Sequence, residues 1–185
     1  MNILVNETHI IDLTGEMAKQ HVDAYVHPTN NYLWFSSEVS ESLKRIAGEY
    51  IETAATNAGP IEVGQAVIAP HGRLKCRYLI HTAAWGQDMM TSELKIRQAV
   101  TAALDLAAAQ GCVSLAIPAV GANIGGFSMP NAVQATFLAI LEHCQQRTSL
   151  REIRFLTADK IMENLVERLM QTALLAIPPE PGGSA

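Results

Sequence analysis

A glycine-rich turn follows a short apolar run in the second half of the chain. Residues 115–117 have the composition of a buried strand, and residues 121–126 read GANIGG. Glycine permits positive φ, so successive backbone N–H groups can point into one concavity. A helix expected to begin near Pro130 adds the positive end of its dipole. The turn is therefore a candidate site for a phosphate or diphosphate, and glycine that serves turn geometry alone is the alternative.

The elements around this turn alternate between two periodicities. Short β-rich runs occupy residues 2–5, 23–26, 65–69, 77–83, 113–117 and 153–157, and helical patterns occupy 43–54, 96–107, 133–144 and 161–173. Most of the runs are apolar on both faces, which indicates a largely parallel sheet covered on both sides. Ligands of such sheets bind beyond the carboxyl ends of the strands, where the turn lies. We expect a single α/β domain over residues 1–176 and a disordered tail over residues 177–185.

Composition excludes several classes of partner. The chain has 185 residues, 49% of them hydrophobic and 17% charged, which suits one domain with a real core. Its net charge of -5, without a basic run, argues against nucleic acid. No apolar run reaches the ~20 residues of a membrane span and no signal-peptide pattern is present, so we expect a cytoplasmic protein without a membrane partner. Three scattered cysteines, Cys76, Cys112 and Cys144, predict neither disulfides nor a metal site. We expect no cofactor, and the oligomeric state stays open.

Four segments together resemble a known family. They read VDAYVHPTNNYL (22–33), LKRIAG (43–48), VGQAVIAPHGRLKCRYLIHTAA (63–84) and SLAIPAVGANIGGF (114–127). Their order and spacing are similar to those of bacterial macrodomains, the ADP-ribose-binding, Appr-1-p processing-like family. The resemblance implies a three-layer α/β/α sandwich with a mixed, mostly parallel six-stranded sheet. It also implies a cleft for ADP-ribose, free or on an ADP-ribosylated protein.

The resemblance assigns ligand-binding roles to matching positions. Asp12, in IDLT, is similar to the aspartate of the family's GDIT, which accepts a hydrogen bond from the adenine amino group; an N-cap or solvated loop aspartate is the alternative. Asn30 matches an asparagine beside the ribose, with a turn-forming residue as the alternative. Phe127 matches an aromatic residue at the distal ribose, with core burial as the alternative. The implied ligand-binding set is Asp12, Leu13, Asn30, Val39, Gly121, Ala122, Asn123, Ile124, Gly125, Gly126 and Phe127.

The first loop departs from the family pattern. Where relatives carry glycines, as in GGGVAGAI, residues 36–43 read SSEVSESL. Residues with a Cβ take a left-handed conformation only at a cost of about 1–2 kcal/mol each, so the loop must follow another path. Glu38 also places a negative charge near the expected diphosphate, which weakens binding unless the carboxylate turns into water.

Catalysis lacks its expected carboxylate. Family hydrolases pair the asparagine that corresponds to Asn30 with a first-loop aspartate, and that position here is Ser40. Losing a positioned base typically removes about 10²–10⁴-fold in rate. Glu38 and Glu41 are the candidate replacements, His27 is another titratable candidate, and His81 is expected to be a buried, hydrogen-bonded histidine.

Three functions follow from these patterns. We expect binding of ADP-ribose or a related nucleotide diphosphate without efficient catalysis. The first alternative is hydrolysis of ADP-ribosyl esters, as in protein de-ADP-ribosylation or O-acetyl-ADP-ribose deacetylation, with Asn30, Glu38 and Glu41 as catalytic residues. The second alternative is a remodelled cleft with a different ligand or a scaffold role.

Overall fold

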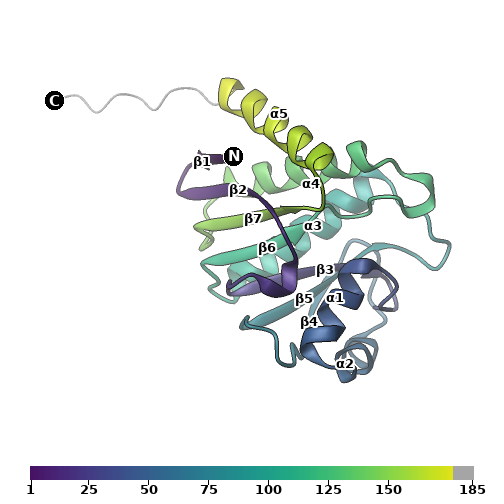
Figure 1. Cartoon of the computed structure of the whole chain (residues 1–185). Coiled ribbons are helices and arrows are strands. Elements are labelled where there is room, and N and C mark those ends of the chain that lie inside the picture. The colour runs from purple at the N-terminus through teal and green to yellow at the C-terminus, as the bar shows by residue number, and fades with distance from the viewer. Residues whose placement is uncertain (177–185) are drawn as a thin grey trace.

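A seven-stranded mixed sheet forms the centre of the computed structural model, which describes residues 1–176 (Figure 1). The predicted tail, residues 177–185, lies outside the described residues. The strands are β1 (Asn2–Val5), β2 (Thr8–Thr14), β3 (Ala24–Asn30), β4 (Ala66–Ala69), β5 (Tyr78–Trp85), β6 (Ser114–Pro118) and β7 (Glu152–Thr157). Their order is β1-β2-β7-β6-β3-β5-β4. The five inner strands run parallel, and β1 and β4 pair antiparallel at the two edges.

The expected fold class is confirmed, with one more strand than predicted. The missed strand is β2, which follows β1 after only two residues. Asn6 takes a φ of 52° in that turn, a conformation that asparagine tolerates well. Thr8, His9 and Asp12 interrupt the apolar residues of β2, so it lacks the continuous apolar run that marked the other strands.

Five α-helices cover the sheet: α1 (Glu38–Ala47), α2 (Tyr50–Ala58), α3 (Glu93–Ala109), α4 (Met129–Cys144) and α5 (Lys160–Ala176). Two 3-10 turns, η1 (Met17–Lys19) and η2 (Ile124–Gly126), complete the elements. The helical pattern predicted over residues 43–54 proved to be two helices. Gly48, with a φ of 107°, ends α1 because it leaves the helical conformation there, and α2 starts two residues later.

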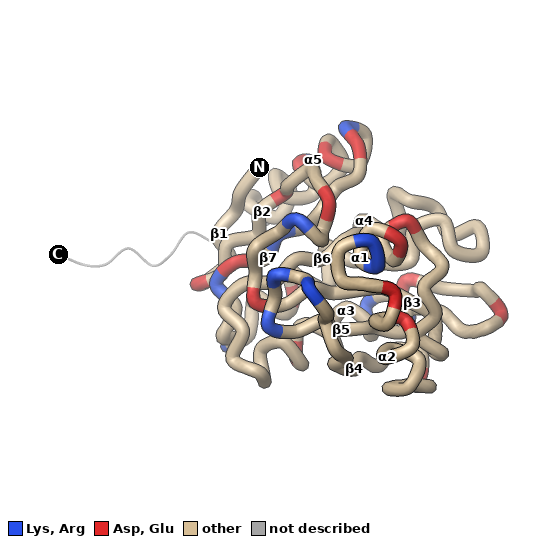
Figure 2. Tube along the Cα trace, turned by 60° about the horizontal axis from the view of Figure 1, so that its bottom comes forward, with Lys and Arg blue, Asp and Glu red and all other residues tan. Residues whose placement is uncertain are grey.

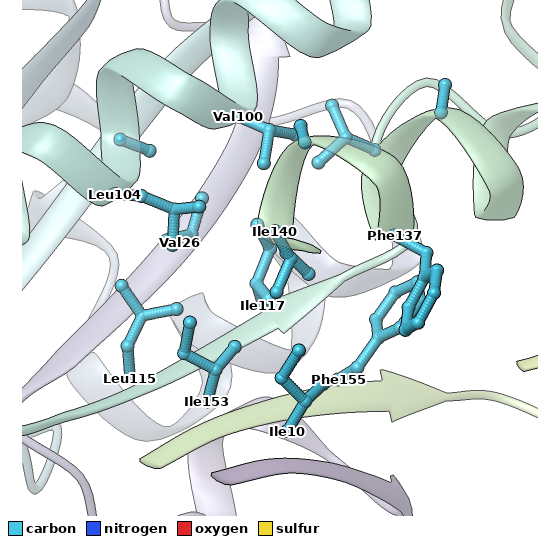
Figure 3. Packing of buried hydrophobic residues seen from close by; sticks show 14 of the residues in the cluster. Ile10, Val26, Val100, Leu104, Leu115, Ile117, Phe137, Ile140, Ile153 and Phe155 are labelled. Atoms are coloured by element: carbon cyan, nitrogen blue, oxygen red, sulfur yellow. The ribbon is translucent and has the colours of Figure 1, made fainter. Parts of the chain in front are cut away.

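Two hydrophobic cores lie on opposite faces of the sheet, which makes three layers. On β3 and β7 neighbouring residues point to opposite faces, as the strand period requires. Val26 and Phe155 pack with α3, α4 and α5, whereas Tyr25 and Leu156 pack with α1, α2 and η1. Figure 3 shows the larger core, where side chains of β6 and β7 meet those of α3 and α4.

The parallel strands bring several loops together at one edge of the sheet. β3, β6 and β7 all run in the same direction, so the loops that follow them leave from their carboxyl ends on the same side. Pro118 ends β6 immediately before the glycine-rich turn. This edge is the place where the fold positions the candidate site.

Candidate functional site

Two glycines of the turn are required by packing as well as by backbone conformation. Gly121, Gly125 and Gly126 have φ values of 78°, 55° and 79°, and Asn123 is also left-handed at 63°. A Cβ on Gly121 would lie 2.7 Å from Ile96 Cδ1, and one on Gly125 would overlap the backbone oxygen of Met89. A Cβ on Gly126 would meet nothing within 4 Å. The turn is therefore pressed against the loop and helix that precede it in sequence.

The turn lines a cavity of about 280 Å³. Gly121 and Ala122 line it, and within residues 1–176 their backbone N–H groups donate to no backbone or side-chain acceptor. The start of α1 and Trp85, at the end of β5, form other parts of the wall. An adjoining cavity of about 160 Å³ shares Val39 and Pro118 with the first and extends to η1 and the end of β7. Both cavities lie at the carboxyl ends of β6 and β7 and share part of their walls.

The first loop forms a capped helix start in place of a glycine loop. Ser37 is the N-cap of α1: its Oγ accepts the Ser40 N–H, and Ser40 Oγ accepts the Ser37 N–H. This reciprocal pairing satisfies groups that the first helical turn otherwise leaves without partners. Glu38 begins the helix, is exposed and lines both cavities. Glu41 lines neither and forms an ion pair with Lys44 at 3.1 Å, so α1 carries charges of both signs (Figure 2).

A chain of buried hydrogen bonds continues inward from this helix start. Ser37 Oγ lies 2.8 Å from Ser40 Oγ, which lies 2.7 Å from His27 Nε2, and His27 Nδ1 lies 2.9 Å from His81 Nδ1. The expectation that His81 is buried and hydrogen-bonded is confirmed. The link to Ser40 through His27 was missed. Its signal was the presence of a histidine in each of two apolar strands, which the sheet register places side by side.

His27 and His81, the two histidines of this hydrogen-bond chain, are both neutral near pH 7. Desolvation holds the pKa of His27 well below its usual range, and His81 adds to this effect. Burial also lowers the pKa of His81 to about 4. A neutral imidazole has one N–H donor and one bare acceptor nitrogen, so the direction of each hydrogen bond constrains the next.

Asp12 lines neither cavity, but a hydrogen bond joins it to the end of β7. Its Oδ1 accepts a hydrogen bond from Thr157 Oγ1 at 3.2 Å, and Thr157 lines that cavity. Its Oδ2 is buried and has no partner among residues 1–176. Burial raises the pKa of Asp12, and Glu163 and Glu167 of α5 raise it further. Leu13, the next residue, points to the other face of the sheet and packs on the smaller core.

Four other predicted ligand residues line neither cavity: Asn30, Gly125, Gly126 and Phe127. Asn30 is buried, and its Oδ1 accepts the N–H groups of Tyr32 and Trp34, each at 3.1 Å. This is the turn-forming geometry considered for it above. Phe127 packs against the larger core, and its carbonyl accepts the Asn123 N–H, which closes the glycine turn.

A larger groove lies elsewhere. It measures about 730 Å³ and runs between β4 and α3, lined by residues such as Gln65, Gln98 and Thr101. None of the predicted site residues lines it. The described part of the chain contains no helix long and apolar enough to cross a membrane.

Comparison with known proteins identifies the family. A family model described as Macro domain matches residues 26–136, more than half of the chain. A protein of Aeropyrum pernix is 34% identical over 126 residues, covering 68% of this chain and 67% of that protein. A protein of Aquifex aeolicus is 35% identical over 122 residues, covering 65% of this chain and 74% of that protein. A relative from Mycobacterium tuberculosis is 32% identical over 137 residues, but the match covers only 37% of its length.

Solved structures show the same fold. The Oceanobacillus iheyensis macrodomain with ADP superposes with a TM-score of 0.84 at 18% identity, covering 96% of this chain and 97% of that one. The Trypanosoma brucei macrodomain in complex with ADP-ribose gives a TM-score of 0.77 at 18% identity, covering 86% of this chain and 68% of that one. With the family model and the relatives, these likenesses place the chain in the macrodomain family.

Proposed function

We propose that this macrodomain binds ADP-ribose or a related nucleotide diphosphate, with the diphosphate in the 280 Å³ cavity. The observation that carries the proposal is that Gly121 and Ala122 line this cavity and that their backbone N–H groups have no acceptor among residues 1–176. Converging backbone N–H groups are a common cradle for phosphate oxygens. The structures of related macrodomains with ADP and with ADP-ribose support this choice of ligand.

The adenine end of the ligand fits the smaller cavity in this proposal. The adenine amino group is a donor, and the buried Asp12 Oδ2 beside Thr157 is an acceptor without a partner among residues 1–176. Asp12 does not itself line the cavity and its Oδ2 is buried, so adenine reaches the carboxylate only if the side chains that cover it move. Asn30, Leu13 and Phe127 then support the walls rather than contact the ligand.

Calorimetric titration tests the proposed function. ADP-ribose and ADP should bind with one site per chain, and AMP should bind more weakly because it lacks the second phosphate. ADP-ribosylated peptide should compete with ADP-ribose for the same site. Equal binding of all three nucleotides, or binding of none, would contradict the proposal and leave a remodelled cleft with another ligand as the better account.

Hydrolysis of an ADP-ribosyl ester is the second candidate, and one observation favours a specific residue for it. Glu38 lines the cavity, whereas Glu41 is paired with Lys44 outside it and Asn30 Oδ1 is occupied by its turn. Glu38 is therefore the carboxylate placed to activate water. Turnover of an ADP-ribosylated peptide that is lost in Glu38→Gln and kept in Glu41→Gln would establish this activity. Absence of turnover in the native protein would leave binding as its function.

A further inference from the structure

Trp85 presents a buried hydrogen-bond donor that lacks an acceptor. Trp85 lines the 280 Å³ cavity and is only 3% exposed, and its buried Nε1–H has no partner among residues 1–176. An indole N–H can only donate, and buried N–H groups without an acceptor are rare in proteins. An oxygen atom of a bound ligand would supply the missing acceptor once the indole turns toward the cavity, because Nε1 is buried in the structure.

Ser37 presents a second donor, because the buried histidine chain sets the direction of its hydrogen bonds. The far end of that chain, His81 Nε2, is buried and has no partner among residues 1–176. At this buried position, an acceptor nitrogen without a partner costs less free energy than an N–H donor without one. We therefore place the His81 proton on Nδ1. His81 Nδ1–H then donates to His27 Nδ1, and the His27 proton must lie on Nε2, from which it donates to Ser40 Oγ.

The hydrogen-bond chain ends at the Ser37 hydroxyl, whose proton is left over for a partner in the cavity. Ser40 Oγ accepts from His27 Nε2–H and from the Ser37 N–H, so its own proton donates to Ser37 Oγ. Ser37 Oγ also accepts the Ser40 N–H. Both acceptor positions of Ser37 Oγ are therefore occupied from inside the protein. Its remaining proton is free to donate into the cavity that Ser37 lines.

This cavity can hold an anion only through uncharged hydrogen-bond donors. No Lys or Arg is among its lining residues, and Glu38 is the one ionisable side chain there. The histidine pair adds no charge because both rings are neutral near pH 7. An anion in the cavity must therefore be held by hydrogen-bond donors with fixed directions.

We propose that Trp85 Nε1–H and Ser37 Oγ–H are diphosphate-binding donors, and that His27 and His81 are positioning residues that keep the Ser37 proton directed into the cavity. The proposal rests on the proposed function. It adds two ligand-binding residues to Gly121 and Ala122, and it commits them to the diphosphate oxygens rather than to the distal ribose.

Affinity measurements on matched variants test the two donors. Trp85→Phe and Ser37→Ala should each weaken binding of ADP and of ADP-ribose alike, by about 10- to 100-fold, the usual loss for a hydrogen bond to a charged group. Ser37→Thr should keep the affinity because it keeps both the hydroxyl and the helix cap. Trp34→Phe and Ser36→Ala are the controls, since both residues are exposed and line no part of this cavity. Urea unfolding of each variant separates loss of the donor from loss of the fold.

Nuclear magnetic resonance tests the same donors without relying on a variant that folds. On addition of ADP the indole N–H signal of Trp85 should shift, and that of Trp34 should stay. Nitrogen shifts of the free protein should show His81 protonated on Nδ1 and His27 on Nε2. The reverse tautomers would overturn the role of Ser37.

The outcomes separate this proposal from the proposed function. If the native protein binds ADP and ADP-ribose but Trp85→Phe and Ser37→Ala bind as tightly, the donor assignment is wrong and the function stands. If the variants weaken ADP-ribose alone, the donors serve the distal ribose and the diphosphate assignment is wrong. If the native protein binds neither nucleotide, both proposals fail.

Discussion

Asp12 is a buried carboxylate with like charges beside it. Glu163 and Glu167 offer oxygens that lie, with one from Asp12, within 4.8 Å of one another. Burial and these two neighbours favour the protonated form and raise its pKa above the ordinary value of 3.8. A carboxyl whose pKa is raised by folding stabilises the native state at low pH, and that contribution is lost as pH rises through the folded pKa.

Replacement of this carboxyl should therefore change stability in a pH-dependent manner. Asp12→Asn should raise the free energy of unfolding relative to the native protein, by little at pH values below 3.8 and by more as pH rises towards 7. Urea unfolding from pH 3 to pH 8 checks this. Asp88→Asn, at an exposed turn, is the control and should show no such trend. A difference that shrinks with rising pH would contradict the electrostatic account.

Glu38 should limit the affinity for an anionic ligand. Its carboxylate lines both cavities, and at a distance of ~4 Å from a phosphate the repulsion is about 1 kcal/mol in water and about 4 kcal/mol at a protein surface. Glu38→Gln should tighten ADP-ribose binding several-fold, and the gain should shrink as salt rises because exposed charges are screened. Glu41→Gln, outside the cavities, should leave the affinity unchanged. Calorimetry at two salt concentrations measures both, and weaker binding by Glu38→Gln would show that Glu38 assists the ligand.

At the scale of elements, the strands that sequence could predict were those with continuous apolar runs. β3, β5, β6 and β7 are buried on both faces, so their runs were visible without a structure. β2 was missed because Thr8, His9 and Asp12 interrupt its apolar residues, whereas β1, which also alternates in burial, has an unbroken apolar run over residues 3–5. The conformation of the first loop, residues 36–43, could not be predicted either. Without the glycines of its relatives, its backbone could follow several courses. A helix cap between Ser37 and Ser40 is one of those courses, and tertiary contacts with His27 select it.

Replacing the glycines of the turn by alanine should destabilise the protein to different extents at the three positions. Gly125→Ala should destabilise most because its Cβ overlaps the Met89 backbone, which cannot move as a side chain can. Gly121→Ala should cost less, since Ile96 Cδ1 is the end of a flexible side chain. Gly126→Ala should lower the free energy of unfolding by only about 1–2 kcal/mol, the cost of holding alanine in a left-handed conformation, because its Cβ meets no other atom. Free energies of unfolding in urea give the order, and equal costs at the three positions would contradict it.

At the scale of the whole molecule, the sheet direction brings distant residues to one groove. Ser37, Trp85, Gly121 and Leu156 come from four separate parts of the chain and line one cavity. That such a groove exists at the carboxyl ends of parallel strands could be predicted from sequence. Which side chains face it could not, because strand alternation and loop packing decide that. Asn30, predicted as a ligand residue, uses its side chain in its own turn, whereas the unpredicted Ser37 and Trp85 line the wall.

The location of the bound nucleotide is the most direct test of the account. In a proton–nitrogen correlation titration with ADP-ribose, the backbone signals of Gly121, Ala122 and Val39 should shift and saturate together. Signals from Thr101 and Ala102, in the groove between β4 and α3, should stay unchanged. Shifts confined to that second groove, or no shifts at a saturating concentration, would contradict the claim that the cavity beside the glycine turn binds the nucleotide.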